Sequence, residues 1–136
     1  MKAENKKIIV ARWVRKAGED ELNIRSILKH RDGAPSGVCF LSQQMAEKYL
    51  KAMLIFYDLE LMKIHDLIKL ISLLENNAPG IKAIGEAAAL LNQYYIETRY
   101  AGDYPEFSWK DAEAASAAAD KIKEYVLEKI KSVKIR

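Results

Sequence analysis

The sequence predicts a single all-α domain that folds as an antiparallel up-and-down bundle of four to five helices. Three observations predict this class. Apolar residues recur at spacings of three and four along most of the chain, which is the period of an amphipathic helix. The three prolines and most of the six glycines fall between these periodic segments, where loops are expected. No run of alternating β-branched residues in the sequence indicates a strand.

Two long helices are expected in the first half of the chain. The first is predicted over about 9–30, with Trp13 and Ile24 among the apolar residues of one face. The second is predicted over about 38–57 and is so apolar that it should lie centrally in the bundle. Its polar residues gather in one narrow stripe, namely Gln43, Gln44, Glu47, Lys48 and Lys51. Such a stripe is typical of a solvated face, and the alternative is a functional surface.

Three further helices are expected in the second half. A short third helix should begin near Asp66, whose carboxylate is a candidate N-cap. A fourth is predicted over about 81–99. The fifth should begin at Ser108, which forms a capping-box pattern with Asp111. The alanine-rich face of this last helix should let it approach a neighbouring helix closely.

The length and composition fit one domain over 1–136, because half of the residues are apolar. The net charge of +3 is unevenly spread. Residues 1–16 hold six basic side chains against one acidic, and residues 121–136 hold six against two, so the residues between them are net acidic. The basic ends should either attract a phosphate or an acidic partner, or simply favour solubility.

The sequence further predicts a cytoplasmic protein that does not contact membranes. Its longest apolar run, over 52–57, is far shorter than the roughly 20 residues that cross a bilayer. The basic start is not followed by the apolar segment of a signal peptide. The single cysteine, Cys39, is expected to be a buried apolar side chain.

The chain lacks the motifs of several common enzyme classes. Two histidines, His30 and His65, and one cysteine lie too far apart in sequence to predict a metal site, and no cofactor is predicted either. No glycine-rich phosphate loop is present. Neither Cys39 nor any serine has a paired histidine that would activate it as a nucleophile.

Polar residues embedded in otherwise apolar helices are the remaining candidates for a site. They would form a nucleotide- or RNA-binding surface from three helices, consisting of Lys48, Lys51, His65, Arg99 and Tyr100. The cations would hold phosphates and the tyrosine would stack on a base. Each candidate also has a structural interpretation. His65 would then serve as a local cap or packing residue, and Arg99 would pair with a nearby carboxylate at a helix end.

A second set of candidates consists of aromatic residues near helix faces and ends. Aromatic side chains are enriched in protein interfaces, and they also fill cores. The sequence leaves both roles open for the four residues concerned, which are Trp13, Tyr94, Tyr95 and Tyr104. In the first role they would form the interface of a homodimer.

Several of these segments together carry a family resemblance. They comprise Trp13 with Ala17 and Asp20, the string SQQMAEKYLKA over 42–52, His65-Asp66-Leu67, and the stretch from Tyr94 to Tyr100. Together with the alanine-rich last helix they resemble a HEPN domain over about 8–130. The resemblance implies an antiparallel helical bundle that is usually assembled as a dimer.

The resemblance also implies two functional classes. Many small prokaryotic HEPN proteins pair with a minimal nucleotidyltransferase, often as a toxin–antitoxin-like or regulatory couple. Others are metal-independent ribonucleases, with an Arg at a helix end and a His about four to six residues later as general acid/base. Arg99 matches that Arg, but 100–107 hold no His. Tyr104, with an ordinary pKa near 10, is a poor substitute. Arg99 and His65 therefore remain weak catalytic candidates.

Three functions follow from these observations. A non-catalytic HEPN module that binds a small nucleotidyltransferase-type protein explains both the resemblance and the missing His. An RNA- or nucleotide-binding protein, with residual cleavage through Arg99, is the first alternative. A structural homodimer without a ligand is the second.

Overall fold

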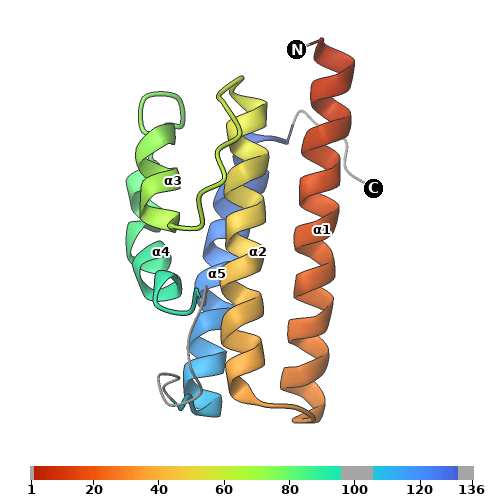
Figure 1. The fold of residues 1–136 in the computed structure, drawn as a ribbon, viewed down its shortest axis with the longest axis vertical. Helices are drawn as coiled ribbons and strands as arrows, with labels where there is room; N and C mark the ends of the chain where they lie inside the picture. Colours follow the sequence, from red (N-terminus) through yellow and green to blue (C-terminus); the bar gives the residue numbers. More distant parts are fainter. Residues whose placement is uncertain (1, 96–105, 132–136) are drawn as a thin grey trace.

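The computed structural model describes residues 2–95 and 106–131, and in these residues it contains helices and no strands. Three long helices form the body of the molecule, and shorter helices pack beside them (Figure 1). Their bounds are α1 Ala3–His30, α2 Pro35–Phe56, α3 Leu67–Leu74, the 3-10 turn η1 Ile81–Ile84, α4 Gly85–Asn92 and α5 Trp109–Lys129. The prediction of an all-α bundle is confirmed.

The three long helices do not alternate in direction. An ion pair of 3.2 Å joins Lys6, near the start of α1, to Asp58, just after the end of α2. Another, of 2.7 Å, joins Arg31 after the end of α1 to Glu113 in the first turns of α5. Helices α2 and α5 therefore both run antiparallel to α1 and parallel to each other (Figure 1). This departs from a simple up-and-down order, because the chain returns along α2 over 57–66 before α3 begins.

Helix α2 lies at the centre, as its composition predicts. It packs against α1 and α5 and also contacts α3 and α4. Large side chains such as Leu50, Met53 and Leu54 are completely buried. Burying an aliphatic side chain of this size contributes about 1.5–3 kcal/mol, so α2 holds the bundle together from within.

Two predicted helix starts are confirmed by their hydrogen bonds. The Asp66 carboxylate accepts from the backbone N–H groups of Ile68 (3.0 Å) and Lys69 (3.2 Å), which caps α3. At the start of α5, the Ser108 hydroxyl accepts from the backbone N–H of Asp111 (3.1 Å), and the carboxylate of Asp111 accepts from the backbone N–H of Ser108 (2.8 Å). These bonds satisfy N–H groups that have no partner within the helix.

The prediction of one helix over 81–99 is wrong. The segment begins as the 3-10 turn η1, and α4 ends at Asn92. The backbone N–H of Tyr94 then bonds to the carbonyl of Leu91 (3.0 Å), which tightens the chain out of the α-helix. This turn directs the Tyr94 ring against Phe107 in an edge-on contact, so tertiary packing overrides the helical pattern here.

Within residues 2–95 and 106–131, no helix is both long and apolar enough to cross a membrane.

Candidate functional site

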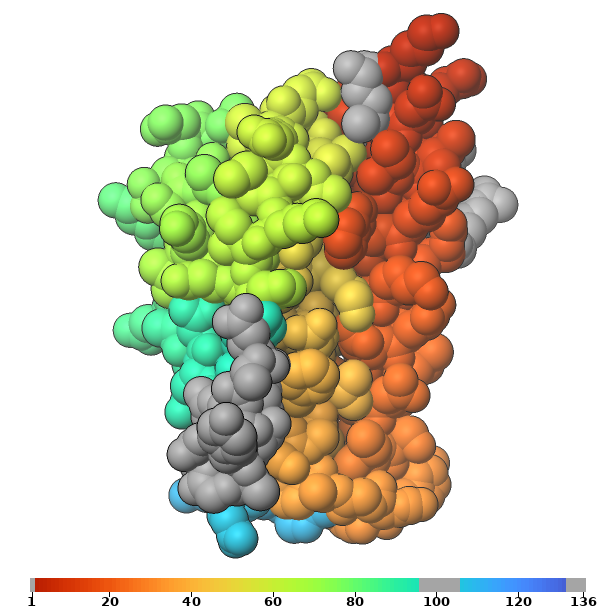
Figure 2. Space-filling model, viewed as in Figure 1, coloured from red at the N-terminus to blue at the C-terminus, as the bar shows by residue number. Residues whose placement is uncertain are grey.

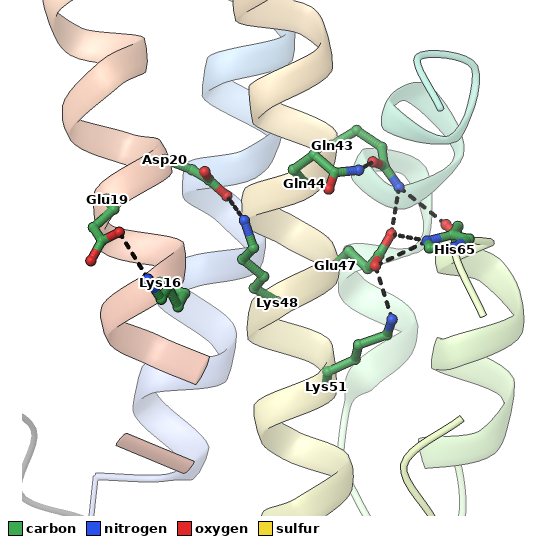
Figure 3. A network of polar contacts seen from close by, with 9 residues as sticks. All are labelled: Lys16, Glu19, Asp20, Gln43, Gln44, Glu47, Lys48, Lys51 and His65. Carbon is green, nitrogen blue, oxygen red and sulfur yellow. Dashed lines mark hydrogen bonds and ion pairs between the residues drawn. The ribbon is translucent and has the colours of Figure 1, made fainter. Parts of the chain in front are cut away.

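The polar stripe of α2 is mostly buried. Gln43 is 0% exposed, and Glu47 and Lys51 are each 6% exposed. The prediction of a solvated face is therefore wrong for these three residues. The reason is the segment over 59–66, which runs back beside α2 and places His65 against the stripe (Figure 3).

Glu47 is the centre of this arrangement. Its carboxylate accepts a hydrogen bond from the Lys51 ammonium (2.9 Å) and lies 3.1 and 3.2 Å from Nδ1 of His65 (Figure 3). The amide of Gln43 donates to the same carboxylate (3.3 Å) and to the backbone carbonyl of His65 (3.1 Å). We call these four residues, Gln43, Glu47, Lys51 and His65, the α2 polar cluster.

The cluster fixes the orientation of the His65 ring. An ionised carboxylate only accepts hydrogen bonds, so Nδ1 is the donor toward Glu47. The ring also stacks on Tyr95, with centroids 4.4 Å apart and planes 13° from parallel. The side chain remains 44% exposed. Ring position and tautomer are thus both set by neighbours, while the opposite ring edge, with Nε2, points away from Glu47.

The burial of the Glu47–Lys51 pair gives it a structural role. Both side chains are 8% exposed. Desolvation of two charges roughly offsets their attraction, but removal of one partner leaves an uncompensated buried charge and costs about 3–5 kcal/mol. The Lys51 ammonium also lies 5.9 Å from the ring centroid of Trp13 on α1. Lys51 therefore links α2 to α1 as well as to Glu47.

Lys48 is also neutralised within the protein. Its ammonium donates to the carboxylate of Asp20 on α1 at 2.6 Å, and the two side chains are 25% and 12% exposed (Figure 3). Asp20 stands out in the sequence only through the family resemblance, because nothing in the spacing of residues 20 and 48 signals their contact. This pair ties α1 to α2 on the side of the helix next to the α2 polar cluster.

The proposed nucleotide- or RNA-binding surface can be judged for three of its five residues. The structure brings Lys51 and His65 together through Glu47, and it directs Lys48 to Asp20 instead. Arg99 and Tyr100 lie outside the described residues. Among the residues that can be placed, the two lysines are paired with carboxylates, so they do not form a cluster of free cations for phosphate.

An open pocket of about 390 Å³ lies beside His65, at the start of α3. Asn92 at the end of α4 donates to Asp66 (2.8 Å) and accepts from the backbone N–H of Leu67 (2.8 Å). The hydrogen bond from Asn92, followed by those from the first backbone N–H groups of α3, holds the pKa of Asp66 below its ordinary value. Sequence reasoning missed three residues of this pocket, Ile64, Lys69 and Asn92. The two polar ones, Lys69 and Asn92, become its lining only through the pairing of α3 with α4.

The four aromatic candidates differ in their surroundings. Tyr94 is 3% exposed and belongs to the core, so its side chain offers little surface to a second chain. Trp13 is partly buried against the core, and Tyr95 is partly buried against His65. Tyr104 lies outside the described residues.

Cys39 is buried, as expected. Desolvation, followed by the charge of Asp111, raises the pKa of its thiol to about 11. The thiol is therefore protonated near neutral pH, and the nucleophilic thiolate is not formed. Within the part of the chain that the structure describes, no group of three or more His, Cys, Asp or Glu side chains could hold a metal ion.

Comparisons with known proteins identify the family. The model of the HEPN domain matches residues 10–130. The crystal structure of TT1696 from Thermus thermophilus is similar at a TM-score of 0.76 and 29% identity, covering 89% of this chain and 98% of that one. The crystal structure of ST0689, an archaeal HEPN homologue, is similar at a TM-score of 0.70 and 30% identity, covering 89% and 97%. A comparison with curated proteins finds no match. The chain belongs to the HEPN domain family.

Proposed function

We propose that this protein is a non-catalytic HEPN module that binds a small nucleotidyltransferase-type protein, as in the toxin–antitoxin-like or regulatory pairs of the family. The observation that carries the proposal is the internal neutralisation of Lys48 and Lys51 by Asp20 and Glu47. Both ammonium groups are compensated by carboxylates of the bundle itself and do not face a phosphate. Among the described residues, these two buried or half-buried ion pairs offer no free cation to a ligand, and the Lys48–Asp20 pair also holds α1 in position on α2.

The sequence around Arg99 supports the same proposal. The chain keeps the Arg of the family's ribonuclease motif and has no His in the following residues 100–107. General acid/base catalysis near neutral pH depends on a group such as imidazole. In the proposed pair, the partner carries the chemistry, and the HEPN module binds and regulates it in the cytoplasm.

One observation favours nucleotide or RNA binding as a second candidate function. The pocket beside His65 contains an exposed ammonium, from Lys69, next to a histidine ring that is held in place by Glu47 and Tyr95. A phosphate could bind there without displacing an internal ion pair. Residual cleavage would require Arg99 as well, and a homodimer could bring two copies of that residue together.

Purification under gentle conditions tests the first proposal. The tagged protein is isolated from its native host, and the proteins that accompany it are identified by mass spectrometry. A nucleotidyltransferase-type protein in a stoichiometric complex is the expected result. Recovery of RNA or nucleotide without a protein partner would favour the second candidate function, and a homodimer recovered alone would contradict both.

A further inference from the structure

The outer face of α1 differs from the interior in placing exposed basic residues beside apolar ones. We call this face the α1 ridge and define it by Ile8, Ile9, Arg12, Trp13 and Lys16. The last four follow the spacing i, i+3, i+4 and i+7, which places them on one side of a helix. They line an open groove of about 390 Å³. In Figure 2, α1 runs as a continuous band along one side of the molecule.

The apolar residues of the ridge combine exposure with a fixed position. Ile8 is 51% exposed. Ile9 and Trp13 are partly buried, and both pack against the hydrophobic core. The ammonium of Lys51 approaches the Trp13 ring from α2. A tryptophan that is held from behind and reachable from outside matches the anchor residues that dominate protein interfaces.

The basic residues of the ridge are available to a partner. Arg12 is exposed and forms no ion pair within the described part of the chain. Lys16 contacts Glu19 at 3.4 Å, but the two side chains are 66% and 61% exposed, and surface pairs of this kind are weak. Residues 1–16 as a whole carry six basic side chains and one acidic. The ridge therefore presents a positive field around an apolar centre.

We infer that the α1 ridge is the docking site for an acidic amphipathic segment of a partner protein. An apolar side chain of that segment would occupy the groove beside Trp13, and flanking Asp or Glu residues would pair with Arg12 and Lys16. This is the helix-in-groove mode of recognition, with charge complementarity selecting the partner. The inference rests on the proposed function in so far as the partner is the nucleotidyltransferase-type protein.

The charge and composition of the α1 ridge favour an acidic protein segment over a second copy of this chain and over single-stranded RNA. A second copy docked through the same ridge by two-fold symmetry would bring Arg12 and Lys16 of both copies together, and like charges oppose that contact. Sites for single-stranded RNA rely on stacking of bases on aromatic rings. The apolar side chains of the ridge are aliphatic apart from Trp13, which favours a protein segment.

The test uses a defined probe and four forms of the full-length protein. The probe is a fluorescein-labelled helical peptide with Leu at positions i, i+3, i+4 and i+7, flanked by Glu. Its binding is followed by fluorescence anisotropy with the wild type, Arg12→Glu/Lys16→Glu, Ile8→Ser, and Lys82→Glu/Lys110→Glu. The last variant makes the same change in net charge at two exposed lysines away from the ridge, which form no ion pair within the described residues. Circular dichroism checks that each variant is folded.

We expect saturable binding by the wild type, weakened at least about tenfold by Arg12→Glu/Lys16→Glu, a factor typical of lost charge pairs in an interface. Ile8→Ser should weaken peptide binding about threefold or more, as loss of apolar contact predicts. Lys82→Glu/Lys110→Glu should weaken it by less than about twofold.

Absence of saturable binding, or equal loss in both charge-reversal variants, would overturn the inference. Tighter binding of an oligouridylate of equal charge would assign the ridge to RNA. A monomer–dimer equilibrium altered only by the ridge variants would assign it to a second copy.

The peptide also separates this inference from the proposed function. Peptide binding reports on the ridge whether or not a nucleotidyltransferase-type partner exists. If such a partner is recovered, its complex should be lost with Arg12→Glu/Lys16→Glu and kept with Lys82→Glu/Lys110→Glu. A complex that survives both variants would leave the proposed function intact and place the partner elsewhere.

Discussion

The α2 polar cluster and the α1 ridge handle positive charge in opposite ways. The ammonium of Lys51 is buried, and a carboxylate 2.9 Å away compensates it. The guanidinium of Arg12 is exposed, and water stabilises its charge instead. A buried charge must be paired to be tolerated, and once paired it is no longer offered to a ligand. An exposed charge needs no internal partner, so it is available for recognition.

Breaking the buried pair should have the largest effect on stability. Glu47→Gln keeps the shape of the side chain but leaves Lys51 buried without a counter-charge and weakens the bond to His65. We expect the free energy of unfolding to fall by about 3–5 kcal/mol, measured by urea denaturation.

The matched control for this prediction is Glu47→Leu/Lys51→Met, which removes both charges together. Replacement of a buried ion pair by apolar residues of similar size is often neutral or stabilising. The double variant should therefore be clearly more stable than Glu47→Gln. Equal losses of stability in the two variants would mean that the pair is not the source of the effect.

A smaller loss is expected at the edge of the cluster, where Asp66 caps α3. Asp66→Ala removes the acceptor for two backbone N–H groups and for Asn92. We expect a loss of about 1 kcal/mol, the usual value for an N-cap, in the same denaturation experiment. Asp66→Asn is the control, since Asn also caps helices well, and it should retain most of the stability.

A comparison of wild type with Asp66→Asn also tests how the stabilisation by this cap depends on pH. The folded protein holds the pKa of Asp66 below its ordinary value, chiefly through the hydrogen bond from Asn92. The resulting stabilisation is complete above the unfolded pKa of about 3.9 and is lost as the pH falls through the lower folded pKa. Wild type should therefore lose stability relative to Asp66→Asn as the pH falls below about 4. Parallel stability curves would contradict the depressed pKa.

Ser42 tests whether every buried polar group of α2 is stabilising. Its hydroxyl is buried and has no hydrogen-bond partner among the described residues. An unsatisfied buried hydroxyl is costly, so Ser42→Ala should leave the free energy of unfolding unchanged or raise it by up to about 1 kcal/mol. A free energy of unfolding that falls by more than about 1 kcal/mol in Ser42→Ala would instead show that the hydroxyl has a hydrogen-bond partner.

The ridge should show the smallest effect on stability. Arg12→Glu changes an exposed residue that forms no ion pair with the residues the structure describes. The free energy of unfolding should therefore change by less than about 0.5 kcal/mol. Thermal denaturation followed by circular dichroism measures this. A larger loss would show that Arg12 supports the fold, and the contrast between the ridge and the cluster would then fail.

Local patterns in the sequence account for most of the fold and for less of the site. The central place of α2 and the caps at Asp66 and Ser108 follow from composition and short-range spacing, and the structure confirms them. The end of α4 could not be predicted, because it depends on the packing of Tyr94 against Phe107. The burial of Glu47 could not be predicted either, since a residue 18 positions later covers it.

The sequence also could not predict whether Lys48 and Lys51 lie at the surface or in the interior. Helical periodicity groups Lys48 and Lys51 with the polar residues of α2 but does not say what lies opposite them. Asp20 and Trp13 lie on another helix, and only the packing of α1 on α2 brings them into contact. Arg99 and Tyr100, which lie outside the described residues, stay predictions.

The parallel course of α2 and α5 has a consequence for the order of folding. Helices α1 and α2 are joined by a short loop, so their hairpin can close early at little entropic cost. The docking of α5 beside α2 instead closes a loop of about 50 residues, which contains the whole of α3 and α4. Contacts between residues so distant in sequence slow folding. The α1–α2 hairpin should therefore be protected from hydrogen exchange first during refolding, and α5 should complete the core last.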